Sequence, residues 1–325
     1  MRFKRIAASL DAPAVLMVQQ KERWVPVAAV LAAAGNTAVE RIDLIEMLGD
    51  WDRNRQRLER GLLKIDIDAA SLDATGPDAL PFEPRSYRDF MLYERHVIDA
   101  GRGYARRFLP TAHRIASIYE SILRRPFPAF RPHPLWYRQP IYYMGNHLAF
   151  VASGAEIRCP SYSNALDYEL ELGFVLAKPL LNATPDEALA AIGGFVVFND
   201  FSARDVQLAE MRSGFGPQKA KHFRNAMASE LVTADEILPV LDTLAAEVRI
   251  NGHCVRATST QGMQHSVGEA LAHVSRDEQL HPGEFFGSGT LPGGSGMENG
   301  VWLKPGDVIE LTIERIGTLR NIIAA

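Results

Sequence analysis

The stretch DYELELGFVLAKP (167–179) decides the fold class, because it alternates polar and apolar residues and then becomes continuously apolar. Alternation with a period of two is typical of a β-strand with one buried face, and a short apolar run is typical of a strand buried on both faces. A second stretch, GGFVVFNDFSARD (193–205), is an apolar run that ends in polar residues. These two neighbouring stretches predict a core built mainly of β-sheet.

Further strands are expected on both sides of this pair. HLAFVASGAEIRCP (147–160) ends in a turn marked by proline, and LAAEVRINGHCVRATST (244–260) contains the Asn-Gly signal of a β-hairpin. GDVIELTIERIGTLRNII (306–323) predicts two closing strands around Gly317. Together these patterns indicate mixed β-sheets.

Helices are predicted to be fewer than strands in this part of the chain. Helical patterns cover 87–108, 184–193 and 266–277, and the last two begin after the N-cap residues Thr184 and Ser266. The fold class of the main part is therefore α+β, dominated by mixed β-sheets.

The beginning of the chain predicts a small unit of its own. Residues 2–20 have the pattern of two short strands around a turn, and 24–35 continues into a helix, with a longer helical pattern after it. The stretch SLDATGPDALPFEPRS (71–86) is rich in Pro, Asp and Gly, as linkers between domains are. We therefore expect a small N-terminal α+β domain over 1–80 and a catalytic domain over 81–325.

Composition narrows the classes of function. The 325 residues are 47% hydrophobic, enough for one large core or a core with a smaller domain. The net charge is -4 and the basic residues are dispersed, which argues against nucleic acid as a partner. Cys159 and Cys254 lack CxxC spacing, which argues against a disulfide framework. No apolar run is long enough to cross a membrane, and Asp11 and Pro13 interrupt the apolar N-terminal stretch, so we expect a cytoplasmic protein.

Four acidic residues stand in segments that should be hydrophobic strand or strand edge: Asp89, Glu169, Glu171 and Asp200. In a strand, Glu169 and Glu171 share one face while the leucines between and after them face the other. Buried carboxylates are unfavourable unless a positive charge neutralises them, and converging acids favour a hard divalent cation. A solvent-exposed acidic edge, with Asp200 as a helix cap, is the alternative.

Several segments, in this order, resemble the fumarylacetoacetate hydrolase family, over about residues 85 to 320. They are DYELELGFVLA, NDFSARDVQ, GFGPQKAKHF, GSGTLPGGSGMENG and LKPGDVIELTIERIG. The resemblance implies a sandwich roll of mixed β-sheets. It implies that Glu169, Glu171 and Asp200 hold Mg²⁺ or Ca²⁺, with Mn²⁺ as a further option. It also implies a homodimer.

The segment SYRDFMLYERH (86–96) is similar to fumarylacetoacetase-type members of this family. There the resemblance makes Asp89 a fourth metal ligand and His96 the base that activates water. The alternative is that Asp89 caps the helix that bears His96 and that His96 is an ordinary half-buried histidine. A glutamate near the C-terminus orients the histidine in fumarylacetoacetase, but GVWLKPGD (300–307) offers no acid at the expected place. Asp99, three residues after His96 on the same helix, could serve as the orienting acid, and the alternative is that it is a solvated helix residue.

The resemblance assigns the remaining site residues. It makes Arg204, Gln207 and Lys221 groups that bind substrate and stabilise negative charge, and Tyr143 and Thr290 substrate contacts. Arg204 and Gln207 would project to one side of a helix. Lys219 is an alternative to Lys221, and Tyr142 is an alternative to Tyr143. Thr290 could instead stabilise a glycine-rich turn. Three basic residues of the segment 112–140 could meet an anionic substrate, although a surface loop is the default there: Arg131, His133 and Arg138.

The expected metal ligands, base and substrate-binding residues suit the hydrolysis of a carbon–carbon bond in a 1,3-dicarbonyl acid of the fumarylacetoacetate or acylpyruvate type. Such a cleavage expels a carbanion, which must leave as a stabilised enolate, and a histidine with a pKa near neutral is a suitable base. The alternative is a decarboxylase, hydratase or tautomerase of 2-oxo acids in the same family.

Overall fold

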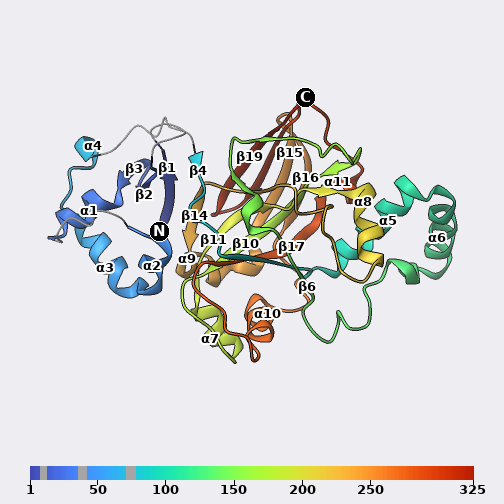
Figure 1. Cartoon of the computed structure of the whole chain (residues 1–325), viewed down its shortest axis with the longest axis horizontal. Coiled ribbons are helices and arrows are strands. Elements are labelled where there is room, and N and C mark those ends of the chain that lie inside the picture. Colours follow the sequence, from blue (N-terminus) through green and yellow to red (C-terminus); the bar gives the residue numbers. More distant parts are fainter. Residues whose placement is uncertain (8–12, 36–41, 71–77) are drawn as a thin grey trace.

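The computed structural model describes residues 1–7, 13–35, 42–70 and 78–325. Its largest sheet runs through the centre of the molecule (Figure 1) in the order β3-β2-β1-β14-β11-β10-β17-β5-β6. The strands in this order are Arg23–Pro26, Val15–Gln20, Arg2–Ile6, Glu230–Thr233, Ile192–Asn199, Glu169–Leu176, Glu284–Ser295, Ser86–Phe90 and Tyr142–Met144. Three short strands pair off this path, namely β4 (Asp78–Ala79), β7 (Phe150–Ala152) and β13 (Asn225–Met227).

A second sheet of the described residues has the order β16-β15-β18-β19-β8. Its strands are His253–Ser259, Ala245–Ile250, Val308–Ile313, Gly317–Ile323 and Glu156–Ile157. Asn251 and Gly252 form the predicted hairpin turn with φ values of 53° and 76°. Leu172 of the large sheet and Leu311 of the second sheet belong to one hydrophobic core. The sheet-rich α+β fold with two packed sheets is therefore confirmed.

A short ladder joins β9 (Leu166–Asp167) and β12 (Ser202–Ala203).

Helices cover the two ends and one edge of the sheets (Figure 1). Helices α1 to α4 lie with β1–β3 at one end, and α5 and α6 form the other end. Thr184 and Ser266 form the predicted N-caps, each within a capping box. The helices are α1 Val27–Ala33, α2 Leu44–Gly49, α3 Trp51–Leu62, α4 Ile67–Ala70, α5 Glu94–Phe108, α6 Pro110–Leu123, α7 Pro185–Ala190, α8 Arg204–Arg212, α9 Ala234–Ile237, α10 Val267–Val274 and α11 Gly296–Asn299, with 3₁₀ turns at η1 Pro128–Phe130, η2 His147–Ala149 and η3 Leu238–Thr243. No described helix combines the length and apolar character needed to cross a bilayer.

One predicted helix begins later than expected. The pattern over 87–108 predicted a helix throughout, but its first part is strand β5, and α5 begins only at Glu94. The reason is tertiary pairing, because β5 runs parallel to β17 and buries Tyr87 and Phe90 in the sheet. The expected surface loop over 112–140 likewise contains most of α6 and η1, while Arg131, His133 and Arg138 are exposed as predicted.

The N-terminal strands continue the large sheet rather than forming a sheet of their own. Strand β1 pairs with β14 in antiparallel register, with Phe3 opposite Leu231. Phe3 also shares a hydrophobic core with Phe198 and Phe285 of the central strands. The division of the chain at residue 80 stays a prediction, and residues 71–77 of the expected linker lie outside the described residues.

Candidate active site

Three carboxylates that are far apart in the sequence meet at the centre of the large sheet. Asp89 lies near the end of β5, Glu171 lies on β10, and Asp200 directly follows β11. One oxygen from each side chain can be chosen so that the three atoms all lie within 4.8 Å of one another. The residues are 6%, 0% and 0% exposed, so water does little to screen the repulsion between them.

The strand order brings these acids together. Strand β10 pairs with β11 on one side and with β17 on the other, and β17 pairs with β5. Gly287 of β17 lies opposite both Gly173 of β10 and Asp89 of β5. A Cβ atom at Gly287 would lie 2.4 Å from Asp89 Oδ1 and 2.6 Å from Glu171 Oε2. Only glycine therefore leaves room for the two carboxylates at this position.

Burial and mutual repulsion disfavour the charged form of these acids. Burial, and then the charge of Asp200, raise the pKa of Asp89 well above its usual range. Burial, Asp89 and Asp200 raise the pKa of Glu171 in the same way. Burial also raises the pKa of Asp200, although Lys221 counteracts that effect. Asp89 Oδ1 is buried and has no hydrogen-bond partner among the described residues. An oxygen-rich group of this kind fits a hard divalent cation.

Glu169, the remaining predicted ligand, has different neighbours. Its two oxygens meet Arg204 Nη2 at 2.6 Å and Lys221 Nζ, and Lys221 also donates to Asp200 at 2.6 Å. Burial alone would raise the pKa of Glu169, but Arg204 and Lys221 outweigh burial and hold it well below its usual value. Glu169 is not part of the group of three carboxylates, and two basic side chains neutralise its charge. Its role as a metal ligand stays a prediction.

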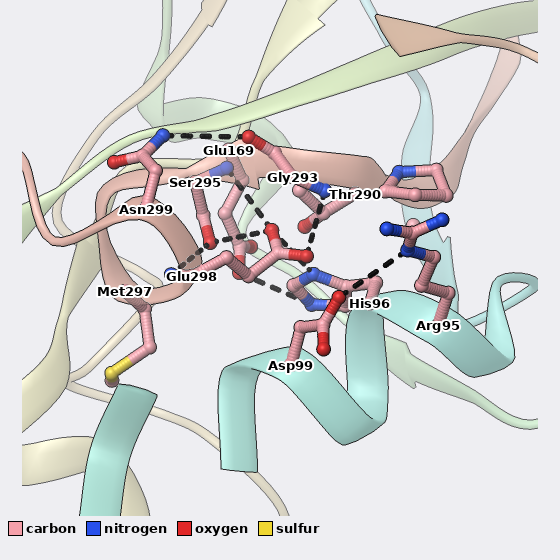
Figure 2. A network of polar contacts seen from close by, with 12 residues as sticks. Arg95, His96, Asp99, Glu169, Thr290, Gly293, Ser295, Met297, Glu298 and Asn299 are labelled. Atoms are coloured by element: carbon pink, nitrogen blue, oxygen red, sulfur yellow. Dashed lines mark hydrogen bonds and ion pairs between the residues drawn. The ribbon is translucent and has the colours of Figure 1, made fainter. Parts of the chain in front are cut away.

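The base predicted from the sequence, His96, lies in the first turn of α5 and is 7% exposed. Figure 2 shows His96 between two glutamates: Nδ1 is 3.0 Å from Glu298 Oε2, and Nε2 is 3.9 Å from Glu169 Oε1. Burial alone would lower the pKa of His96, but Glu298 and Glu169 outweigh burial and raise it. The N-cap of α5 is Tyr93, so Asp89 does not cap this helix.

Glu298, rather than Asp99, is the acid next to His96. Asp99 instead pairs with Arg102 at 2.6 Å and with Arg95 at 3.4 Å. Glu298 was not predicted, because it lies just before the stretch GVWLKPGD (300–307) where the acid was expected. The available signal was the capping-box pattern from Ser295 to Glu298, which the structure forms at the start of α11.

Glu298 is held in place by main-chain and side-chain donors. The amide of Gly293 donates to Glu298 Oε1 at 2.8 Å, and the amide and hydroxyl of Ser295 donate to Oε2 at 3.1 and 2.8 Å. These bonds fix the carboxylate that faces His96 Nδ1, so His96 Nε2 is directed toward Glu169 (Figure 2).

The remaining predicted residues also reach this region. The Tyr143 hydroxyl donates to Asp200 at 2.7 Å, while Tyr142 packs against the core, so Tyr143 is the tyrosine of the two that contacts the acidic group. The Thr290 hydroxyl lies 3.4 Å from Glu171 Oε1. Gln207 accepts a hydrogen bond from Arg204 at 2.9 Å, which agrees with the predicted spacing on one helix face.

Lys219 does not compete with Lys221, because Lys219 is exposed and lies over the Tyr162 ring. One buried acid was not singled out in the sequence. Asp167 accepts from Arg204 Nε at 2.8 Å and from the amides of Gly296 and Met297 at 2.9 Å each. Asp167 therefore joins Arg204 to the first turn of α11 and has a structural role.

Comparisons with known proteins agree with this architecture. The model of the family described as fumarylacetoacetate (FAA) hydrolase, C-terminal, matches residues 116–324. The chain is 31% identical over 272 residues to oxaloacetate tautomerase Fahd2a, mitochondrial, of Rattus norvegicus, covering 82% of this chain and 78% of that protein. It is 31% identical over 185 residues to the 2,4-didehydro-3-deoxy-L-rhamnonate hydrolase of a Sphingomonas species, covering 56% of this chain and 64% of that protein.

A solved structure of fumarylacetoacetate hydrolase from Exiguobacterium antarcticum shares the fold of this chain. It superposes with a TM-score of 0.69 at 23% identity, and the match covers 100% of this chain and 99% of that one. The match to the Sphingomonas protein spans less than two thirds of that protein's length. The named relatives include both a hydrolase and a tautomerase.

Proposed function

Because the chain belongs to the fumarylacetoacetate hydrolase family, we propose that it is a divalent-metal-dependent hydrolase that cleaves a carbon–carbon bond in a 1,3-dicarbonyl acid. The observation that carries the proposal is His96, which is buried and lies between Glu298 and Glu169, while Lys221 joins Glu169 to Asp200 of the acidic group. A site that only bound a metal would have no need of an oriented imidazole.

Asp89, Glu171 and Asp200 would hold the cation, which we assign as Mg²⁺ or Ca²⁺ with Mn²⁺ as an alternative. When bound, the cation would stabilise the negative charge that develops on the oxygen of a departing enolate. Tyr143 and Thr290 contact Asp200 and Glu171, so they orient the carboxylates and border the place where substrate would lie.

His96 is suited to accept a proton from water. Its Nδ1 faces Glu298, while its Nε2 lies 3.9 Å from Glu169, too far for a hydrogen bond, and so is free to take the proton. The hydroxide oxygen then bonds to the acyl carbonyl carbon. The bond from that carbon to the central carbon breaks, and its electron pair passes to the enolate. The enolate takes the proton back from His96, which yields a carboxylic acid and a keto acid.

Arg204 and Lys221 would neutralise the negative charge of Glu169. Both are buried, and both contact Glu169, so they balance that carboxylate next to the base. Gln207 accepts from Arg204 Nη1 and fixes the direction of its guanidinium. Without these contacts the charge of Glu169 would add to the repulsion among the three neighbouring acids.

A tautomerase of 2-oxo acids is the second candidate. The relative named as a tautomerase aligns with 82% of this chain. A tautomerase would use the same oriented imidazole to move a proton between carbon and oxygen, without a hydrolytic water. The homodimer expected from the sequence remains a prediction.

An assay of fumarylacetoacetate and acylpyruvates tests the proposal. We expect loss of diketone absorbance with two acid products in equal amounts, loss of activity with a chelator, and recovery with Mg²⁺. We expect His96→Ala to lower kcat by about 10² to 10⁴. Enol–keto conversion of a 2-oxo acid without C–C cleavage would favour the tautomerase, and wild-type hydrolysis by His96→Ala would exclude the proposed role of the base.

A further inference from the structure

The turn that carries Glu298 needs anchors from other elements. The ladder between β10 and β17 ends at Ser295, so it does not place the residues after that point. Glu298 accepts from the amides of Gly293 and Ser295, and these bonds within the turn fix its side chain but not its distance from α5. Figure 2 shows this turn beside His96 of α5. The contact between Glu298 and His96 therefore depends on what holds the turn in place.

One anchor is Asp167, which is fully buried. Its Oδ1 accepts from the amides of Tyr168 and Gly296 at 2.9 Å each. Its Oδ2 accepts from the amide of Met297 at 2.9 Å and from Arg204 Nε at 2.8 Å. Burial raises the pKa of Asp167, but all four of these partners are N–H donors and offer no acceptor to a proton on the carboxyl group. The charged carboxylate thus ties the first two residues of α11 to Arg204.

Arg204 is a rigid support for this anchor. It is buried, and its guanidinium also donates to Glu169 at 2.6 Å and to Gln207 at 2.9 Å. Neutralising Arg204 would need no contact with α11, yet half of the four hydrogen bonds that Asp167 accepts come from amides of α11. Asp167 therefore does more than balance a guanidinium, because it fixes α11 on the centre of the site.

Helix α11 also lies directly against α5. A Cβ atom at Gly103 would be 1.8 Å from the carbonyl oxygen of Met297, so only glycine allows the two backbones to approach this closely. His96 lies about two helical turns before Gly103, on the same face of α5. A shift of α11 relative to this face would change the distance between Glu298 Oε2 and His96 Nδ1, which is 3.0 Å.

We propose that Asp167 is a positioning residue that acts through Glu298: it ties α11 to Arg204 and so sets the contact that orients the His96 imidazole. The inference rests on the proposed function in one respect, that His96 transfers a proton, and it holds equally for hydrolysis and for tautomerisation. It gives the link between Arg204 and α11 a role in activity.

Asp167→Asn tests this role, because asparagine keeps the size of the side chain but turns an NH₂ group toward N–H donors. We expect kcat to fall about 10- to 100-fold with little change in KM. The gain in melting temperature with Mg²⁺ should persist, because Asp167 is outside the group of three carboxylates. Glu284→Gln is the matched control and should change kcat little, because Glu284 is a buried acid paired with Arg88 at the far end of β17 from α11.

A double variant shows whether Asp167 acts through Glu298. If it does, Asp167→Asn combined with Glu298→Gln should have the kcat of Glu298→Gln alone. Losses of kcat that multiply would mean that Asp167 acts independently of Glu298, and the proposal would be wrong. Wild-type kcat in Asp167→Asn would overturn it as well.

Gly103→Ala moves α11 by a second route if Asp167→Asn does not fold. Alanine favours the helical backbone of α5 but separates α5 from Met297. We expect kcat to fall, with the gain in melting temperature from Mg²⁺ retained and no further loss of kcat in combination with Glu298→Gln. Wild-type kcat in Gly103→Ala would show that the position of α11 does not control His96.

NMR of protein labelled with ¹⁵N-histidine separates this inference from the proposed reaction, because it needs no substrate. The ring signals of His96 are those that His96→Ala lacks. Asp167→Asn should shift them in the same direction as Glu298→Gln does, and Glu284→Gln should leave them in place. If no dicarbonyl acid or 2-oxo acid is converted but these shifts occur, the proposed function fails and the positioning role stands. If a dicarbonyl acid is hydrolysed and Asp167→Asn leaves the His96 signals unchanged, the positioning role alone is wrong.

Discussion

Glu169 and Glu171 lie two residues apart on strand β10, yet the regions around them have opposite electrostatics. Around Glu169, Arg204, Lys221 and His96 supply positive or titratable groups, and the pKa of this glutamate falls despite burial. Around Glu171, burial and two further acids raise its pKa. Both residues are at least 95% buried, so different exposure cannot explain the difference.

The contrast shows how one strand can serve two purposes. The region around Glu169 is neutralised by side chains of the protein itself, which makes it a rigid support next to His96. The region around Glu171 lacks such compensation apart from the contact of Lys221 with Asp200, so it favours an external cation. Four predictions test this division, each by changing one side chain.

Glu171→Gln should have the largest effect on activity. It removes one of three candidate cation ligands, and we expect kcat/KM to fall by about 10³ or more, which corresponds to several kcal/mol of transition-state stabilisation. The same change relieves repulsion with Asp89 and Asp200, so the protein without divalent cation should melt at a temperature no lower than wild type.

The two readouts are measured together, by kinetics and by thermal melting with and without Mg²⁺. Wild type should gain stability when Mg²⁺ is added, because the cation binds only the folded state, and Glu171→Gln should gain little. Equal stabilisation of both proteins by Mg²⁺ would show that the cation binds elsewhere.

Glu169→Gln should have the second-largest effect, and we expect that effect on the stability of the fold rather than on activity. It leaves Arg204 and Lys221 buried with fewer compensating charges, although each retains one acidic partner. Breaking a buried ion pair destabilises by about 3–5 kcal/mol, and we expect roughly the lower end of that range in urea unfolding without divalent cation. A variant as stable as wild type would mean that the ion pairs do not support this region.

Glu298→Gln should lower kcat by about 10- to 100-fold, a typical loss when the partner that orients a functional group is removed. The glutamine keeps the size of the side chain but loses the charge that faces His96 Nδ1. KM should change little, because His96 acts on water in the proposed reaction. Wild-type kcat in this variant would show that Glu169 alone suffices to position His96.

The positions of these acids in the strands could be predicted from the sequence, because they depend on residue type and on the local pattern of polar and apolar residues. Period-two alternation placed Glu169 and Glu171 on one strand, and Asp200 followed an apolar strand, as the structure confirms. Which glutamate is neutralised could not be predicted, because it depends on where Arg204 and Lys221 arrive from later parts of the chain.

Long-range contacts also explain the errors. Strand β5 was predicted as helix because its parallel partner β17 lies about two hundred residues further along the chain. Glu298 was missed for the same reason: a capping box predicts only the start of a helix, and only the packing of α11 against α5 brings that glutamate to His96. Local spacing favoured Asp99 because residues three apart on a helix are neighbours.

Asp99→Asn should therefore have the smallest effect of the four. Asp99 pairs with Arg95 and Arg102, whose side chains are 71% and 39% exposed, and such pairs contribute about 0–1 kcal/mol. Because Arg102 keeps its pair with Glu120, the helix should stay in place and kcat should change by less than about twofold. Measured in parallel with Glu298→Gln, this variant decides which acid acts on His96. A loss of kcat in Asp99→Asn equal to that in Glu298→Gln would mean that Asp99 also positions His96, and that Glu298 is not the acid that orients the imidazole on its own.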